Sequence, residues 1–572
     1  MQKLKKFTTA VSGTLIIFSA TTSIADEVVT HQSGDMCIIS SEIPLEGAKY
    51  KKKDKKTETK LCSYHMNSST RPVVEVGQID VALCPKLFSS SPAVELFKIP
   101  SNVDKQNLQK YKCNWSVGDK TRGFKKLAKY KYDIAGQSIS SMMGYYHISR
   151  ALGITSVPAS VYKTLNKTTH KEVALRGKKN NNKQDSSLAK YWRHIYSAFD
   201  GKIDRRFVTA NGSYSFGALS ENPRGEQKYY EDFWPGAAQK KGITAFKNTK
   251  TYKNLGRKEH VSKFISANFE DRNLQKLRAM KDASDMIILD SIFGQGDRFG
   301  NIHSYHTFLT PEEDGSLKKI DLADIEKMLE MDGMAKEIDS FKRAKKLPND
   351  WKSQINKRNQ RLVLISKNFL SRLGYRFAYT QEIYLKDNDA GLVNKVNPFQ
   401  ERRMMEGVYH VNQGTYEQVL KLHKMVQNGG LDTFLTENLF MDSTEKERFK
   451  EGLDYVTRDL INKEKSGKLF LDLSIKEHFT NFPDKSSGVY NTEVIKSGVR
   501  VRTGRILTEG LSNKSLLLSD SGVALQFNVG DLLSTMAVTK IIDGTSFTKV
   551  KVINSRALAP GTEVYIWSAA IL

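Results

Sequence analysis

The alternation of apolar and polar residues divides the chain into a mixed first part, a helical middle and a strand-rich end. Apolar residues recur at helical spacing over 139–153, and this pattern predicts a helix that stops at a glycine and is followed by an extended segment at Pro158. The apolar run 286–293 predicts a buried helix, and helical spacing returns at 416–425 and 445–461. This mixture of strands and helices predicts an α+β fold.

The character of the chain changes at about residue 487, where short alternating segments are broken by turns. The predicted strands are 498–502, 515–518, 547–552 and 563–567. We expect residues 487–572 to form a separate small β-barrel, SH3-like in type. Such an appendage would either bind a partner or act as a lid that completes the preceding domain.

The first 25 residues have the pattern of a secretory signal peptide. Lysines at 3, 5 and 6 precede a mostly apolar stretch at 11–20, and small residues at 23–25 offer a cleavage site after Ala25. No later stretch approaches the roughly 20 apolar residues that a spanning helix requires. We therefore expect an exported chain, periplasmic or secreted, without a transmembrane anchor after cleavage.

All the cysteines lie before residue 114, at positions 37, 62, 84 and 113. In an exported chain this even, clustered set predicts two disulfides that staple a region spanning residues 26–114, with all three connectivities open. A zinc site is the competing interpretation, which the lack of a Cys-x-x-Cys pair disfavours.

Composition and charge narrow the class of protein. A chain of 572 residues with 39% hydrophobic and 27% charged residues is long enough for several cores and is not of the disordered class. The formal charge of +26, or +23 after removal of the three signal-peptide lysines, would attract acidic or anionic partners. Nucleic acid is an unlikely partner, because the lysine-rich stretches 51–56 and 178–183 lack interleaved aromatic residues.

One short motif carries chemistry, Gly294-Gln295-Gly296-Asp297-Arg298-Phe299-Gly300-Asn301-Ile302-His303. An Asp-Arg pair followed three residues later by Asn is typical of a phosphoryl-transfer catalytic loop. In such a loop Asp297 accepts the proton of the attacking hydroxyl, and Asn301 supplies an amide oxygen to a magnesium ion. The competing interpretation is a polar turn with an Asp-Arg ion pair.

A kinase needs a second carboxylate after this loop to hold the metal. We prefer Asp321, which ends a strand-like run at 317–320, because a hairpin with a strand at 301–309 would fold it back beside Asn301. A helix-capping role for Asp321 is compatible with metal binding. Asp387 is the reserve candidate, because alternating apolar residues lead into its polar turn.

Three segments of the chain, in order, resemble the atypical kinases, a group that includes phosphatidylinositol kinases, HipA-like kinases, the Golgi casein kinase and the bacterial spore-coat kinases. The likeness spans about residues 115–425. The segments are Tyr145-Tyr146-His147-Ile148-Ser149-Arg150-Ala151-Leu152-Gly153-Ile154 with Val157-Pro158-Ala159-Ser160-Val161, Gly296-Asp297-Arg298-Phe299-Gly300-Asn301-Ile302, and Lys319-Ile320-Asp321.

The resemblance implies a two-lobed kinase-like fold, with a small lobe and insertions over 115–280 and a mostly helical catalytic lobe over 281–480. It implies ATP and Mg²⁺ or Mn²⁺ as cofactors. It makes Asp297 the catalytic base, and Asn301 and Asp321 the metal ligands. A lysine on a small-lobe strand should hold the nucleotide phosphates, and we assign it to Lys125, although lysines at 126, 129 and 131 crowd the same stretch.

One departure from the family pattern bears on activity. The helix glutamate that should pair with this lysine is replaced by Met142, and Gln137 and Asp133 lie out of register. The leading hypothesis is an exported ATP- and metal-dependent kinase that phosphorylates a hydroxyl, with Ser or Thr of a protein substrate implied by the resemblance. A pseudokinase that serves as an adaptor is the alternative, and a phosphatidylinositol-type lipid kinase is the third.

Overall fold

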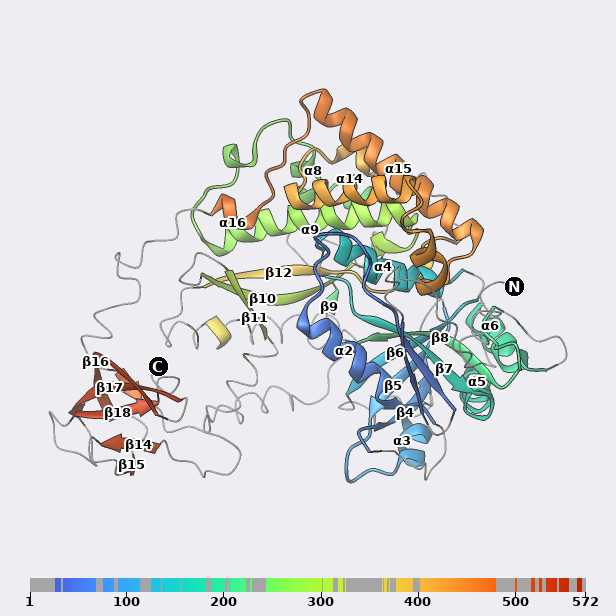
Figure 1. Ribbon diagram of the computed structural model, residues 1–572, viewed down its shortest axis with the longest axis horizontal. Helices are drawn as coiled ribbons and strands as arrows, with labels where there is room; N and C mark the ends of the chain where they lie inside the picture. The colour runs from blue at the N-terminus through green and yellow to red at the C-terminus, as the bar shows by residue number, and fades with distance from the viewer. Residues whose placement is uncertain are drawn as a thin grey trace, which may run out of the picture. The chain divides into compact units, whose positions relative to one another are not determined.

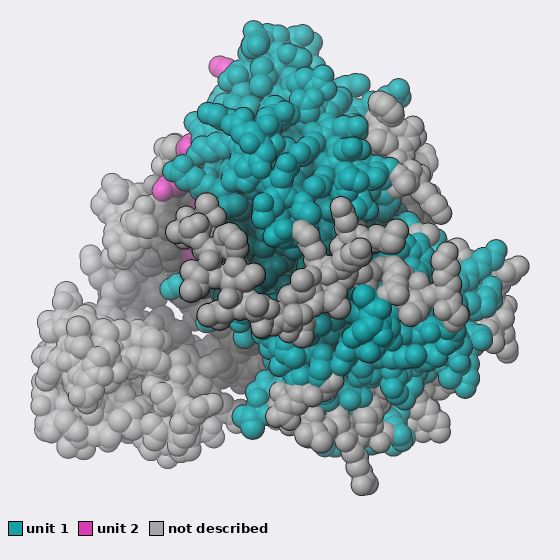
Figure 2. Space-filling model, turned by 45° about the vertical axis from the view of Figure 1, so that its right-hand side comes forward, with its two compact units in different colours: residues 1–261, 279–304, 383–474 teal, residues 262–278, 305–382, 475–572 magenta. Residues whose placement is uncertain are grey.

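The computed structural model describes two compact units of the chain (Figure 2). Unit 1 comprises residues 1–261, 279–304 and 383–474, and unit 2 comprises 262–278, 305–382 and 475–572. The description begins at residue 26 and, after 479, is confined to six strands. It omits 32–33, 68–75, 87–90, 114–124, 135, 155, 182–186, 201–203, 205, 223–226, 229–242, 301, 312–316, 323–324, 326–362, 364, 368–369, 371–376 and 394–401. The predicted signal peptide, Asn301 and most of residues 322–374 therefore lie outside it.

Unit 1 is built on an eight-stranded sheet with the order β1-β2-β7-β8-β6-β5-β4-β3 (Figure 1). Neighbouring strands are antiparallel except for β3 and β4, which are parallel. The strands are β1 Glu27–Thr30, β2 Met36–Ile39, β3 Tyr64–His65, β4 Ile79–Pro85, β5 Val94–Lys98, β6 Lys126–Tyr132, β7 Ser160–Asn166 and β8 Tyr214–Glu221.

The core of this sheet is lined by aromatic and aliphatic side chains from several helices as well as from the strands. Trp192, Tyr130, Tyr132 and Phe207 are fully buried in it. The helices that surround the sheet are α2 Lys52–Cys62, α3 Lys105–Lys112, α5 Lys167–Asn181 and α6 Ser187–Ser197. Tyr130 and Tyr132 share one face of β6, because side chains two residues apart point the same way in a strand.

Two disulfides tie these helices to the sheet, as the cysteine count predicts. Cys37 on β2 pairs with Cys62 at the end of α2, and Cys84 on β4 pairs with Cys113 just after α3. This settles the connectivity that the sequence leaves open and fits an exported protein. The expected boundary near residue 114 falls inside the sheet, since β1 to β5 and β6 to β8 share it.

A helical layer of unit 1 lies against α4, Ile139–Ala151, which crosses β7 and β8 (Figure 1). The C-terminal part of α9, Asp271–Phe293, packs on α4 through Tyr145 and Phe293, whose ring centroids are 4.3 Å apart. Helix α14, Gln413–Gln427, and helix α15, Ser443–Lys465, complete the layer. The helices predicted over 139–153, 286–293, 416–425 and 445–461 are thus confirmed.

Shorter helical segments connect these elements. They are α7 Ile243–Lys247, α8 Lys250–Leu255, η2 Val261–Lys263, η3 Arg298–Gly300, η5 Asn388–Ala390, η6 Met405–Gly407, the π-helix η7 Phe434–Asn438, and α16 Ile475–His478. None of the helices in the described part of the chain is both long and apolar enough to cross a membrane.

A second sheet has the order β11-β10-β12, and β9, Gln227–Lys228, pairs with the start of β10. Strand β10, His303–Pro311, pairs antiparallel with β11, Leu317–Asp321, so the predicted hairpin is confirmed. In unit 2, Phe308, Leu322, Ile325, Val363 and Leu370 form a small core beside these strands. Strand β12 spans Ala378–Tyr384.

The C-terminal part of unit 2 contains a six-stranded antiparallel sheet with the order β13-β16-β17-β18-β14-β15. The strands are β13 Val499–Val501, β14 Leu516–Ser519, β15 Ala524–Gln526, β16 Asp531–Ile542, β17 Thr545–Asn554 and β18 Glu563–Trp567. The strands predicted here are confirmed, while closure into a barrel stays a prediction.

Gly452 on α15 lets this helix touch the end of α9. A Cβ atom at position 452 would lie 2.0 Å from the carbonyl oxygen of Ile292. We expect Gly452→Ala to destabilise the protein by about 1–3 kcal/mol, because the helices must move apart. Gly256→Ala is the control, since its Cβ would meet nothing closer than 3.5 Å. Equal denaturation midpoints for both variants would contradict this packing.

His170 on α5 is expected to make stability depend on pH. Its Nε2 donates to the carbonyl of Ile195 and its Nδ1 accepts from the hydroxyl of Ser215, at 2.8 and 2.9 Å. Burial lowers the pKa of His170 from 6.5 to about 4. The unfolded chain therefore binds the extra proton first, and this contribution to stability is lost as pH falls from 6.5 towards 4.

The variant His170→Phe keeps an aromatic ring in the core but cannot be protonated. Its free energy of unfolding, measured by denaturant titration, should fall less steeply over that pH range than that of the wild type. The exposed His260 provides the control substitution, which should keep the wild-type slope. Parallel slopes for the wild type and His170→Phe would contradict the prediction.

Candidate active site

The loop that carries Asp297 begins where α9 ends. Gly294 has a left-handed backbone, φ +62°, which glycine adopts without strain, and it turns the chain out of the helix. The backbone NH of Gln295 then donates to the carbonyl of Asp290 at 3.0 Å. The side-chain oxygen of Gln295 accepts from the backbone NH of Asp297 at 3.2 Å. These two hydrogen bonds hold the short turn that follows the buried helix, and Asp297 on this turn is exposed.

Arg298 attaches this turn to α9 through a buried ion pair with Asp290. The Nε of Arg298 lies 3.0 Å from Oδ2 of Asp290, and both side chains are about 1% exposed. The hydroxyl of Tyr145 on α4 donates to the same carboxylate at 2.8 Å. Arg298 thus pairs with an aspartate of the preceding helix, and this pair fixes the turn next to Asp297.

The segment after β12, residues 386–392, docks on the same loop. Arg298 donates to the carbonyl of Lys386 at 2.6 Å and to the side-chain oxygen of Asn388 at 2.5 Å. Gln295 donates to the carbonyl of Asp387 at 3.2 Å. The structure thus brings the reserve acidic candidate, Asp387, to the loop of Asp297.

The backbone of Asp387 is left-handed, with φ of +55°. This conformation is uncommon for a residue other than glycine, and such strained residues cluster at functional sites. The turn sends the chain from β12 into η5, which contains Asp389. Both carboxylates are thereby presented to β6.

Two lysines of β6 pair with these carboxylates. The Nζ of Lys129 lies 2.6 Å from Oδ1 of Asp387, and the Nζ of Lys131 lies 3.2 Å from the same atom. Lys131 also pairs closely with Asp389. All four side chains are largely buried, so each charge depends on its partner.

Helix α4 holds the acidic segment from the other side. The backbone NH of Ser138, its N-cap residue, donates to the carbonyl of Asp389 at 2.7 Å. The hydroxyl of Ser141 donates to the carbonyl of Asn388 at 2.7 Å. The side-chain amide of Gln137 donates to Oδ2 of Asp389 at 2.6 Å. Sheet, helix and loop therefore converge on residues 387–389.

The pKa values of the carboxylates of Asp297, Asp387 and Asp389 differ, because their charged neighbours differ. Burial alone would raise the pKa of Asp387, but Lys129 and Lys131 outweigh it and hold the pKa well below its usual range. Lys131 likewise lowers the pKa of Asp389 against the effect of burial. The crowding of protein around Asp297, together with the charges of Asp389 and Asp387, raises its pKa. Asp297 is thus the most basic of the three, as suits a group that accepts a proton.

The donor set of this site consists of oxygen atoms, which suits a hard cation such as Mg²⁺ or Mn²⁺. Within the described residues, no group of three or more His, Cys, Asp or Glu side chains is placed to hold a metal ion. Mg²⁺, however, is commonly bound by one or two carboxylates together with substrate phosphates. Asp387 fits that mode of binding, with nucleotide phosphates as the remaining ligands.

The other residues predicted for the site are Asp321, Asn301 and Lys125. Asp321 ends β11, faces Thr307 across the hairpin and lies 3.3 Å from the Nζ of Lys319. It belongs to unit 2, and its role as metal ligand stays a prediction. Asn301 lies outside the described residues. Lys125 precedes β6, and its backbone carbonyl accepts from the NH of Lys98 at 2.9 Å.

Sequence reasoning did not assign roles to Lys129, Lys131 or Asp389. The two lysines are two positions apart, which is the spacing of one strand face. This spacing indicates two lysines on the same face of one strand, but the neighbouring lysines at 125 and 126 make the pattern hard to recognise in the sequence. Asp389 follows Asp387 by two residues in the turn that already held the reserve candidate.

Comparison with known proteins gives weak likenesses only. No family model and no curated protein matches the chain. A crystal structure of the Golgi casein kinase with Mn/ADP bound is 11% identical, covers 67% of this chain and 73% of its own, and has a TM-score of 0.34. A second structure of the Golgi casein kinase is 9% identical, with 67% and 72% coverage and a TM-score of 0.32. At these TM-scores neither likeness assigns a role to a residue.

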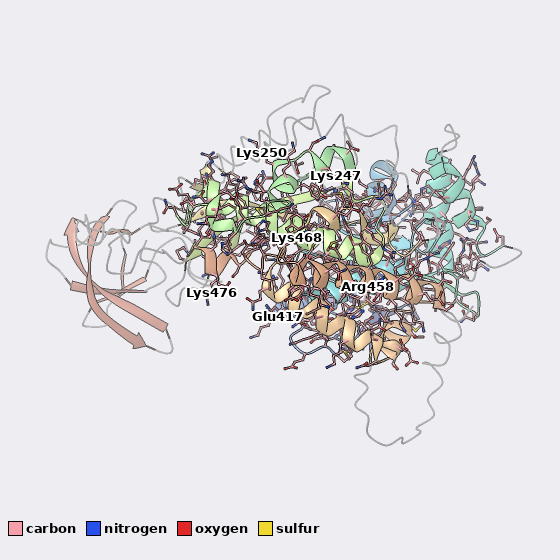
Figure 3. The ribbon with its side chains drawn as sticks, turned by 90° about the horizontal axis from the view of Figure 1, so that it is seen from above. Lys247, Lys250, Glu417, Arg458, Lys468 and Lys476 are labelled. Carbon is pink, nitrogen blue, oxygen red and sulfur yellow. A yellow bond between two sulfur atoms is a disulfide. The ribbon has the colours of Figure 1, made fainter. Side chains whose placement is uncertain are left out.

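Replacement of Arg298 should destabilise the turn that carries Asp297. Arg298→Leu leaves Asp290 buried without its cation, and we expect a loss of about 3–5 kcal/mol in the free energy of unfolding. Arg458 on α15, labelled in Figure 3, is the matched control, because its pair with Asp454 is exposed. Arg458→Leu should cost at most about 1 kcal/mol. Similar losses in both variants, measured by denaturant titration, would contradict the role given to Arg298.

Proposed function

We propose that the protein is a phosphotransferase that uses ATP and Mg²⁺ or Mn²⁺ to phosphorylate a hydroxyl group. One observation carries the proposal: Asp297, Asp387 and the lysine pair of β6 meet at one place although they come from three distant parts of the sequence. A structural ion pair needs only two of these groups. A base, a metal carboxylate and phosphate-binding cations together are the parts of a kinase site.

In this proposal Asp387 takes the role of metal ligand, and Asp321 is kept as the alternative. The bound cation would neutralise charge on the nucleotide phosphates, and Lys129 and Lys131 would hold the phosphate oxygens. Asp297 would accept the proton of the acceptor hydroxyl. Arg298 and Gln295 would keep Asp297 and Asp387 at a fixed separation, because both contact the two segments.

We propose a Ser or Thr hydroxyl of a protein as the acceptor, following the resemblance seen in the sequence. The formal charge of +26 favours an acidic protein substrate. Action outside the cytoplasm agrees with the predicted signal peptide and with the two disulfides. An inositol lipid is the other candidate acceptor, because the kinases that the catalytic-loop motif resembles include phosphatidylinositol kinases.

A pseudokinase adaptor is the second candidate, and one observation favours it. Helix α4 contains no acidic residue, so the lysines of β6 have no helix glutamate to orient them. In protein kinases this pair must be in place for activity, so a site that lacks it favours a protein that binds nucleotide poorly. Isothermal titration with ATP and Mg²⁺ or Mn²⁺ separates the two candidates, because an adaptor of this kind should bind neither.

Asp297→Asn should separate chemistry from binding. Asp297 is exposed and is the proposed base, so the variant should fold normally and bind ATP with Mn²⁺, yet transfer phosphate about 10²–10⁴-fold more slowly. Asp387→Asn should instead weaken metal-dependent ATP binding. Transfer is measured with labelled ATP, using mixed acidic proteins and inositol-lipid vesicles as acceptors. Unchanged transfer by Asp297→Asn would exclude it as the base.

A further inference from the structure

Helix α4 lacks the glutamate that orients the nucleotide-binding lysine in protein kinases. In protein kinases a glutamate on the small-lobe helix forms an ion pair with the lysine that holds the nucleotide phosphates. Helix α4 has the sequence Ile139 to Ala151 without Asp or Glu, and Met142 is buried at the position expected for that glutamate. A lysine that binds phosphate still needs a carboxylate to fix its side chain in the free protein.

Asp389 supplies such a carboxylate from a different element. It lies on η5, is 5% exposed and pairs with Lys131, while Lys129 pairs with Asp387. The backbone NH of Ser138 and the amide of Gln137 hold Asp389 from the start of α4. Helix α4 therefore still sets the position of the lysine, but it does so through neutral donors and an intermediate carboxylate.

Charge explains why position 137 carries an amide. The amide nitrogen of Gln137 lies 2.6 Å from Oδ2 of Asp389. A glutamate here would bring a further negative charge against Asp389, beside Asp387 and Asp297, and like charges this close disfavour ionisation. Lys129 and Lys131 pair with Asp387 and Asp389 in the present arrangement, and a neutral donor at position 137 adds no further charge to it.

We propose that Asp389 is the positioning residue that orients Lys131 towards the nucleotide phosphates in place of a helix glutamate, and that Gln137 holds Asp389 for this task. The two carboxylates of the turn thus have different tasks. Asp387, which pairs with both lysines in the free chain, would bind the cation when nucleotide is present, and Asp389 keeps its pair with Lys131. The use of Lys131 for nucleotide rests on the proposed function, whereas its pairing with Asp389 is a property of the free chain.

Lysine labelling tests the pairing without nucleotide. In the full chain treated with acetic anhydride, Asp389→Asn should raise the acetylation rate of Lys131 about tenfold, the equivalent of one lost charged hydrogen bond, and leave Lys129 within about twofold. The exposed pair of Lys171 and Asp200 is the matched control, where Asp200→Asn should change the rate of Lys171 little. Equal increases at Lys129 and Lys131 would mean general loosening and would overturn the proposal.

A double-mutant cycle then tests how Asp389 acts on the nucleotide. By titration calorimetry with ATP and Mn²⁺, Asp389→Asn should weaken binding about tenfold in the wild-type background and less than about twofold when Lys131→Met is present. Equal losses in both backgrounds would show that Asp389 contacts the cation or nucleotide directly, and would contradict the proposal.

Relocating the carboxylate provides a rescue. In the variant Gln137→Glu combined with Asp389→Asn, the hydrogen bond of 2.6 Å is kept in reverse and the negative charge moves to the residue before the N-cap of α4. This variant should recover both slow labelling of Lys131 and ATP affinity to within about threefold of the wild type. Failure to recover the slow labelling would contradict the assigned role of position 389.

The two proposals fail in different ways. A wild-type protein that binds no ATP with either cation removes the phosphotransferase function, while the labelling results still decide whether Asp389 orients Lys131. Binding that is normal in Asp389→Asn removes the positioning role and leaves the phosphotransferase function in place.

Discussion

The pairing of Lys129 and Lys131 with Asp387 and Asp389 is the interaction on which the site depends. It joins the central strand β6 to the turn after β12 across a sequence separation of about 258 residues. Because all four groups are largely buried, removal of one partner would leave a buried charge poorly compensated. The position of the turn at residues 387–389 is therefore coupled to the register of the sheet.

A second buried ion pair, between Arg298 and Asp290, anchors the loop of Asp297 to α9 and reaches the same turn through Lys386 and Asn388. Buried ion pairs add little net stability, because desolvation offsets attraction, but they define geometry sharply. Here the pair holds Asp297 beside the turn that carries Asp387. The close contact of Gly452 with Ile292 fixes the same end of α9 from the outer helical layer.

The elements that sequence analysis predicted well are those with local signals. The helix before Asp297, the helix α4 and the β10–β11 hairpin all follow from periodicity and turn residues. The membership of the cysteine-bearing segment in the main sheet did not follow, since β2 pairs with β7 and β5 with β6 over long sequence distances.

The site itself was predicted only in part, for the same reason. The lysine that faces the carboxylates depends on the alternation of β6, which a register shift opposite Leu96 and Phe97 interrupts. The neighbourhood of Asp297 and Asp387 depends on hydrogen bonds from Gln295 and Arg298 to a segment about 90 residues away. Neither relationship leaves a local pattern in the sequence.

Anomalous diffraction from crystals grown with Mn²⁺ and ADP would locate both the cation and the nucleotide. We expect a manganese peak bonded to the carboxylate of Asp387, with the nucleotide phosphates against Lys129 and Lys131. A peak bonded to Asp321 instead, or nucleotide bound away from β6, would contradict it.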